Sequence, residues 1–224
     1  MKVASLVLAS LLLLTVAAVS ADTVSYTSNT IPDTLCDWGP LYLTVPKYNS
    51  PHAVLTSVAI TFHGNVAGTI KYENKGATPD TITGHLQAVE NLYDINNVLL
   101  ITVTPEDTRS DTLPAYDGVT DFGGASGRTY TGVSDTASGG WSSSTALYLA
   151  MFTGAGNLSL PTFALASSYA EGGGNLSSRF ITDAGAWMSV EYTYDVIPEP
   201  GTIALVSLGL AGIGVWRRRR GKRA

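Results

Sequence analysis

The chain of 224 residues has one cysteine, three histidines and few charged residues (14%). A single cysteine, Cys36, cannot form an intramolecular disulfide, so the fold must depend on its hydrophobic core. We expect a buried or incidental thiol, with intermolecular pairing as the alternative, because no histidine that could activate it lies nearby in the sequence. His52, His63 and His85 lack the spacing of zinc ligands and are expected in structural or surface positions, His63 being solvated on the strand face opposite Phe62.

Positive charge is scarce in the middle of the chain. Residues 22–196 contain six lysines and arginines against 17 acidic residues, a net charge of −11. Such a surface repels anionic polymers and attracts cations, and no basic patch suits a phosphate backbone. The composition therefore argues against nucleic acid as a partner.

Two apolar segments lie at the two ends of the chain. Residues 1–21 contain one positive charge at Lys2, an apolar run over residues 6–19 and small residues up to Ala21. This arrangement is typical of a secretory signal peptide, with cleavage expected after Ala21. We therefore expect residues 22–196 to form one exported domain.

The second apolar segment, residues 202–216, is uncharged and is followed by the basic cluster Arg217, Arg218, Arg219 and Arg220. An apolar helix followed by arginines is retained in a membrane with the basic side in the cytoplasm. We expect a single transmembrane helix over 202–216 and a cytoplasmic tail over 217–224. The helix would be about 22 Å long against a hydrocarbon core of about 30 Å, which is short for a permanent span.

The segment before this helix, residues 197–201, contains Pro198, Glu199 and Pro200. Two prolines exclude regular structure and predict an accessible hinge. The three-part tail resembles the PEP-CTERM sorting signal of Gram-negative bacteria. The resemblance implies that Pro198, Glu199 and Pro200 are recognised by a membrane-embedded exosortase, and that the helix is a transient intermediate on the way to the cell surface. An ordinary uncleaved anchor is the alternative.

The middle of the chain shows the alternation of β-strands. Period-two patterns occur at residues 56–62 and 187–196, and a β-branched run covers 98–104. Turn-rich stretches lie between them: Asn65 with Gly68, and residues 74–76, 116–118, 123–124, 138–140 and 172–174. Residues 86–100 come nearest to a helical pattern, but their asparagines argue against a long helix. We predict an all-β fold: a jelly-roll-like antiparallel β-sandwich of many short strands.

Several segments of the middle resemble the choice-of-anchor E domain, a β-rich surface module. They are residues 55–66 with 70–74, residues 116–127, residues 152–156 and residues 190–194. The resemblance would cover nearly all of residues 25–196. It implies a location at the cell surface and brings no catalytic residues with it.

Five acidic residues cluster within 16 positions: Glu106, Asp107, Asp111, Asp117 and Asp121. Clustered carboxylates on a loop are suitable ligands for calcium, and we expect Asp117 and Asp121 to be the ligands if the ion binds. The spacing does not match an EF-hand, and Asp and Gly are also good turn formers. Turn formation without any cofactor therefore remains the alternative.

Three aromatic residues, Tyr116, Tyr130 and Trp141, lie in or beside the glycine-rich centre. Exposed rings there could stack on sugars, although packing in the core is the more common use of such rings. We expect a non-catalytic surface or matrix protein, structural or adhesive, in contact with exopolysaccharide. A calcium-dependent carbohydrate-binding module is the alternative. A secreted glycoside hydrolase comes third, because it would need one desolvated carboxyl facing another across a cleft.

Overall fold

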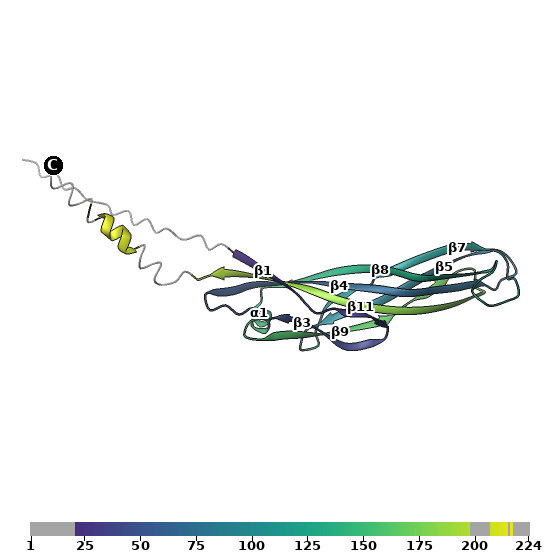
Figure 1. Cartoon of the computed structure of the whole chain (residues 1–224), viewed down its shortest axis with the longest axis horizontal. Coiled ribbons are helices and arrows are strands. Elements are labelled where there is room, and N and C mark those ends of the chain that lie inside the picture. Colours follow the sequence, from purple (N-terminus) through teal and green to yellow (C-terminus); the bar gives the residue numbers. More distant parts are fainter. Residues whose placement is uncertain (1–20, 198–206, 215, 217–224) are drawn as a thin grey trace, which may run out of the picture.

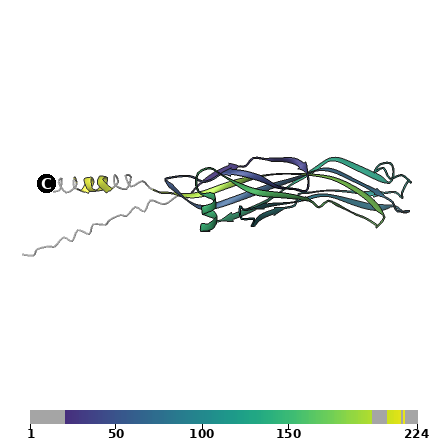
Figure 2. The ribbon, with the colours of Figure 1, turned by 90° about the horizontal axis from the view of Figure 1, so that it is seen from below.

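Two antiparallel β-sheets packed face to face form an elongated body (Figures 1 and 2). The computed structural model describes residues 21–197, 207–214 and 216. The first sheet contains β1 (Ala21–Thr27), β2 (Ile31–Leu35), β11 (Leu176–Val196), β4 (Ala53–Asn74) and β8 (Gly127–Ser143). The second contains β10 (Tyr169–Glu171), β5 (Asp80–Tyr93), β9 (Asn157–Ala166), β3 (Trp38–Pro46), β6 (Leu99–Val103) and β7 (Glu106–Leu113).

Three long strands determine the shape of the first sheet. β4 and β11 pair over their whole lengths, and β8 pairs with the other side of β4 as an edge strand. β1 and β2 share the remaining side of β11. Because side chains alternate between the faces of a strand, each long strand contributes one row to the core and one row to the outer surface.

Both ends of the sandwich domain lie at the same end of the body. Ala21 in β1 pairs with Asp195 in β11, and the Ile197 N–H donates to the His52 carbonyl at 2.8 Å. The two predicted export segments therefore join the domain side by side. Cleavage after Ala21 would remove the first residue of β1 and leave its other six.

The hydrophobic core consists of two clusters that follow one another along the body. The proximal cluster, nearer the chain ends, includes Phe62 of β4 and Tyr192 of β11, while the distal cluster includes Val66 and Tyr72 of β4. Trp38 contacts both clusters, and its indole N–H donates to the Ala184 carbonyl at 3.3 Å.

Between the clusters lies a polar section of the core, which we call the waist, formed by Gly64 of β4, Glu90 of β5 and Thr162 of β9. Glu90 and Thr162 are both 0% exposed. Neither carboxylate oxygen of Glu90 nor the Thr162 hydroxyl has a hydrogen-bond partner among the described residues. Glu90 Oε2 lies so close to Gly64 that a Cβ at that position would collide with it. The waist therefore holds a buried carboxyl that has no hydrogen bond of normal geometry and is influenced only by the nearby Asn65 main-chain N–H, where both neighbouring sections of the core are apolar.

The all-β antiparallel sandwich predicted from the sequence is confirmed, and the three predicted strand regions lie in β4, β6 and β11. Residues 86–100 form no long helix, as expected, since β5 continues to Tyr93. The jelly-roll-like connectivity stays a prediction.

The prediction of many short strands is wrong, because β4, β5, β8 and β11 are 22, 14, 17 and 21 residues long. Two predicted turns, Asn65 with Gly68 and residues 138–140, lie inside β4 and β8. Close packing explains two of these glycines. A Cβ at Gly139 would lie 2.7 Å from Ile101, and one at Gly68 would collide with the Ile181 carbonyl of the neighbouring strand.

Helices are few in the described part of the chain. The short helix α1 (Ala146–Phe152), which the sequence did not predict, packs Met151 and Phe152 into the proximal cluster. Residues 207–214 and residue 216 are helical within the predicted segment 202–216. Of the helices that can be described, none has the length and hydropathy to cross a membrane. The predicted signal peptide up to residue 20 lies outside the described residues.

Candidate functional site

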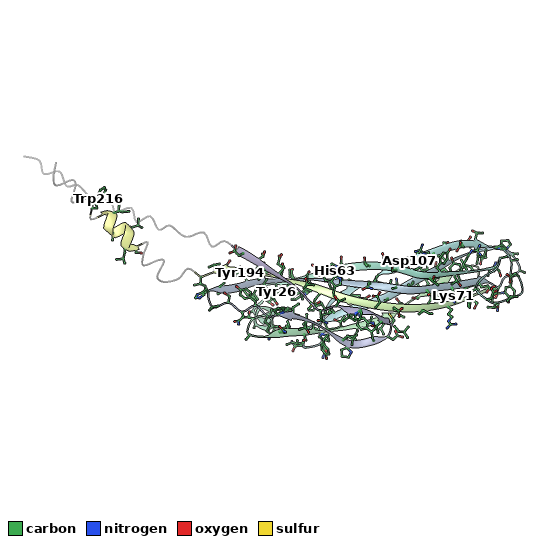
Figure 3. All side chains as sticks on the ribbon, viewed as in Figure 1. Tyr26, His63, Lys71, Asp107, Tyr194 and Trp216 are labelled. Atoms are coloured by element: carbon green, nitrogen blue, oxygen red, sulfur yellow. The ribbon has the colours of Figure 1, made fainter. Side chains whose placement is uncertain are left out.

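A cleft of about 410 Å³ opens on the outer surface of the first sheet, directly over the waist. It is lined by Asp33, His63, Gly64, Asn65, Ser134, Asp135, Thr136 and Trp187, from β2, β4, β8 and β11. In Figure 3, His63 lies about midway along the body, between Tyr194 near the chain ends and Asp107 toward the far end. We call this feature the waist cleft.

Two stacked rings form part of its lining. His63 and Trp187 are direct partners in the register of β4 and β11, so both side chains point outward at the same level. Their ring centroids are 3.8 Å apart and their planes differ by 8°. The expected position of His63 on the face opposite Phe62 is confirmed. The stack leaves His63 and Trp187 half-buried, so the His63 ring is partly solvated.

Asp33 and Asn65 meet across β11 because the residue between them is a glycine. Gly185 pairs with Asn65, and a Cβ at Gly185 would lie 2.6 Å from Asp33 Oδ1 and 2.9 Å from Asn65 Oδ1. The Asn65 side-chain amide donates to Asp33 Oδ1 in this gap. A carboxylate and an amide are thus fixed side by side at the surface.

The other side of the cleft is the edge strand β8. Thr136 pairs with Asn65, which places its hydroxyl on the outer face beside the amide. Asp135 pairs with the buried Val66, so its carboxylate lies on the opposite face of β8, where its Oδ2 accepts from the Glu106 N–H at 3.4 Å, a weak contact between the two sheets. The waist cleft therefore combines aromatic rings with hydroxyl, amide and carboxylate groups, all within one concave surface.

Glu90 lies behind this cleft, on the core side of Gly64. Burial, followed by the nearby negative charge of Asp33, raises the pKa of Glu90 to about 8. The group is therefore a neutral carboxylic acid at acidic pH and ionises only under mildly alkaline conditions.

The acidic cluster is split between a strand and a loop. Glu106, Asp107 and Asp111 lie in β7, so the expectation of one acidic loop is wrong for these three. Asp117 and Asp121 do lie in the loop between β7 and β8. Asp117 accepts main-chain N–H groups from Val119 (3.0 Å) and Ala125 (3.4 Å), and Asp121 accepts that of Gly123 (2.8 Å).

These contacts give Asp117 and Asp121 a turn-forming role. The pKa of Asp117 is lowered, and the hydrogen bond from the Val119 N–H is the largest cause. Within the part of the chain that the structure describes, no three His, Cys, Asp or Glu side chains gather as a metal site. Calcium binding at Asp117 and Asp121 stays a prediction, and its test is the melting temperature with calcium and with a chelator.

A buried glutamate holds the same loop to the sandwich. Glu73 is 0% exposed, and its two oxygens accept the Phe122 N–H at 2.8 Å and the Ser126 hydroxyl at 3.0 Å. We expect Glu73→Ala to lower the free energy of unfolding by about 1–3 kcal/mol, because two buried donors lose their acceptor. Urea denaturation measures this change. Unaltered exchange of the Phe122 amide in the variant would contradict the role.

The aromatic residues proposed for sugar stacking are used largely for packing. Trp141 stacks on Phe152 and meets Tyr148 edge to face, at centroid distances of 6.5 and 4.7 Å. The Tyr130 hydroxyl donates to Asp111 Oδ2 at 2.6 Å. Tyr116 lies in the loop, where its hydroxyl bonds that of Thr120 at 2.7 Å. The structure does not bring these three rings together with the waist cleft.

The remaining candidates occupy separate places. Burial raises the pKa of Cys36 to about 11, so the thiol is protonated and a poor nucleophile. His85 stacks on Tyr169 at 4.3 Å, and its Nδ1 contacts Glu106. Pro198, Glu199, Pro200 and the four arginines Arg217 to Arg220 lie outside the described residues.

Most of the waist cleft cannot be recognised in the sequence. Its residues come from four strands separated by up to about 150 positions, and no local spacing connects them. One signal was available for the buried acid: Glu90 occupies the same phase of the alternating pattern as Leu86 and Leu92, which are both buried. That phase predicts a carboxyl pointing into the core.

Comparison with solved structures gives only distant similarities. Two crystal structures of infectious bursal disease virus particles, the T13 particle and the VP2 subviral particle, both match with 13% identity and a TM-score of 0.22. The matches cover 82% and 90% of this chain, and 42% and 50% of the viral chains, so this chain spans half or less of their length. No curated protein matches this chain.

The C-terminal segment of the chain matches a known protein-sorting motif. The PEP-CTERM protein-sorting motif covers residues 196–220, which include the Pro-Glu-Pro sequence, the apolar segment and the four arginines. The resemblance seen in the tail is thereby confirmed, while the similarity to the choice-of-anchor E domain stays a prediction. The chain carries a PEP-CTERM sorting motif, which points to an exported protein that an exosortase sorts to the cell surface or beyond.

Proposed function

We propose that this protein is a non-catalytic surface or matrix protein that binds an extracellular polysaccharide in the waist cleft. The observation that carries the proposal is the juxtaposition of the His63 and Trp187 rings with Asp33, Asn65 and Thr136 in one concave surface. Ligand sites of a few hundred cubic ångströms commonly combine apolar rings with a few polar groups that fix orientation. Sugars need this combination, since they present apolar C–H faces and hydroxyls that both donate and accept.

The geometry supports binding without catalysis. Glycoside hydrolysis uses two carboxyl groups that flank the scissile bond. Glu90 has the raised pKa of a general acid, but it has no exposed surface and lies on the core side of β4. It cannot contact a glycosidic oxygen in the cleft without a rearrangement of the sheet. We therefore propose that Asp33 and Asn65 act as hydrogen-bonding groups for the sugar.

Retention on the extracellular polysaccharide of the producing bacterium tests this function. We expect Trp187→Ala to weaken binding at least about tenfold, equivalent to about 1.4 kcal/mol, because the ring contributes apolar contact area. The matched control is Tyr42→Ala, which removes a 52% exposed ring on the second sheet and should leave binding unchanged.

A second variant separates binding from folding. Thr136→Ala removes one hydroxyl from the exposed edge strand and should keep the native melting temperature while weakening retention about threefold or more, as expected for one lost hydrogen bond. The proposal fails if the native protein is not retained, or if Tyr42→Ala weakens retention as much as Trp187→Ala does.

A further inference from the structure

We infer that two copies of this chain form a two-fold dimer through an apolar patch on the outer face of the second sheet. This feature, which we call the second-sheet patch, consists of Tyr42, Val89, Tyr93, Leu99, Phe163 and Leu165 from β3, β5, β6 and β9. It lies on the opposite side of the sandwich from the waist cleft. The inference goes beyond the proposed function, because the dimer forms whether or not the cleft binds a polysaccharide.

The register of the strands brings these side chains onto one face. Val89 pairs with Leu165, and Tyr93 pairs with Leu99. Leu92, next to Tyr93 in β5, is 0% exposed and points into the core. Since side chains alternate between the faces of a strand, the patch residues point outward. The most exposed members are Tyr42 (52%), Leu99 (50%) and Leu165 (55%).

Two aromatic rings of the patch are held against the sheet. The Phe163 and Tyr93 ring centroids are 5.5 Å apart, with an angle of 80° between the planes. A Cβ at Gly39 would lie 2.3 Å from Phe163 Cδ1, so the glycine in β3 leaves room for this ring. Rings that already have fixed positions lose little conformational entropy when a partner covers them.

The second-sheet patch carries no charge, although the domain is strongly acidic. Within β3, β6, β9 and residues 87–93 of β5, the only charged residue is Glu90, which points into the core. The outer face of the first sheet, in contrast, presents Asp183 and Glu191 of β11 in the same phase as Trp187. Two domains of net charge −11 repel one another through such a face. The second-sheet patch allows two copies to meet without like charges in contact.

Hydroxyl groups beside the patch already have partners within it. The Thr44 and Ser159 hydroxyls are 2.8 Å apart, and the Thr102 hydroxyl donates to Asn91 Oδ1 at 2.6 Å. Another protein surface can cover such groups at little cost, because they keep these hydrogen bonds. A sugar would need free donors and acceptors at the same place. The patch is therefore better suited to an apolar protein surface than to a polysaccharide.

The uncharged area has the size of a small interface. It extends over the ten residues of β9, about 33 Å, and across four strands from β3 to β6, about 14 Å. Two copies would therefore bury about 1,000 Å² in total, which is the lower limit for specific interfaces. We expect a dimer that dissociates at micromolar concentrations.

The positions of the chain ends favour a second copy as the partner. A two-fold axis parallel to the strands stacks the two second sheets in an aligned packing and places each patch on its own equivalent. Both domains then keep their two chain ends at the same end of the dimer. The sorting motif begins at residue 196, so the tails of both copies can reach one membrane. The waist cleft of each copy stays open on the opposite sheet.

Analytical ultracentrifugation of the mature protein, purified from the surface of the producing bacterium, tests the inference. Between about 1 µM and about 200 µM we expect a monomer–dimer equilibrium with a micromolar dissociation constant. Raising the NaCl concentration from about 0.05 M to about 0.5 M should lower this constant, because salt screens the repulsion between two acidic domains.

Two variants assign the contact to the patch. Leu165→Glu and Leu99→Glu should each raise the dissociation constant at least about tenfold, because the two-fold axis brings two carboxylates into one apolar interface. The matched control is Ile181→Glu, which places the same side chain at a 41% exposed position on the outer face of the first sheet and should leave the dimer unchanged. Melting temperatures establish that each variant is folded.

A photo-crosslinker at position 165, activated on intact bacteria, identifies the partner. A product that contains two copies of this chain supports the dimer. A product with a polysaccharide or with a different protein overturns it, because the patch then has another occupant. A protein that remains monomeric at about 200 µM, or an equal loss of dimer in Ile181→Glu, overturns it as well.

Discussion

Replacing Glu90 by glutamine should remove a large part of the pH dependence of stability between pH 5 and pH 8. Glu90 is fully buried, and although the Asn65 main-chain N–H opposes the shift, burial and the charge of Asp33 raise its pKa from 4.5 to about 8. The folded state therefore binds this proton more tightly than the unfolded state does. The free energy of unfolding of the native protein should fall as the pH rises through this interval and level off above pH 8.

The size of the effect follows from the shift in pKa. At 1.36 kcal/mol per pKa unit, the loss of stability reaches at most about 5 kcal/mol. Glu90→Gln cannot ionise, so it should resemble the native protein at pH 5 and be several kcal/mol more stable than it at pH 9. Urea denaturation at pH 5, 7 and 9 measures the difference.

A matched control distinguishes Glu90 from the other acids. Glu171→Gln removes an exposed carboxyl and should follow the pH profile of the native protein. If the profiles of the native protein and Glu90→Gln run parallel from pH 5 to pH 9, the buried carboxyl has found a partner in solution, and our description of the waist is wrong.

Replacing Pro198, Glu199 and Pro200 by alanines should stop maturation of the protein. The PEP-CTERM motif over residues 196–220 points to recognition by an exosortase, and the resemblance places that recognition in these three residues. The native protein, carrying an internal epitope and expressed in a bacterium of the same kind, should lose its tail and leave the inner membrane. The alanine variant should keep its full mass and stay in the membrane fraction.

Glu191→Gln provides the control for the sorting variant, because it removes one carboxyl outside the motif, in β11. It should mature like the native protein. If both the native protein and the alanine variant keep Arg217 to Arg220 in the membrane fraction, the tail is a plain anchor and the sorting account fails.

The β-sandwich architecture could be predicted from the sequence, whereas the lengths of the strands could not. Alternation at residues 56–62 and 187–196 correctly predicted parts of β4 and β11. Glycines misled the prediction because they are common in turns. In this fold Gly68 lies against the Ile181 carbonyl of the neighbouring strand and Gly139 lies against Ile101, so these glycines serve contacts between strands. Such contacts leave no trace in local sequence.

The sorting tail could be recognised in the sequence, whereas the cleft could not. A sorting signal must be read as a short linear segment, so its proline, glutamate and arginine residues can be recognised in the sequence. The cleft depends on pairing between residues far apart in the chain, such as His63 with Trp187. The sequence therefore predicts the destination of the protein, whereas the rings expected to contact sugar, Tyr116, Tyr130 and Trp141, lie away from the cleft.

Hydrogen–deuterium exchange of the mature protein, with and without its extracellular polysaccharide, tests the central claim most directly, because it locates the bound ligand without altering any residue. The account predicts slower exchange over residues 63–65, 134–136 and 185–187, strongest in the edge strand β8, whose outer side pairs with no described strand. Protection confined to β3 and β9 of the second sheet, or to the loop containing Asp117 and Asp121, would contradict it.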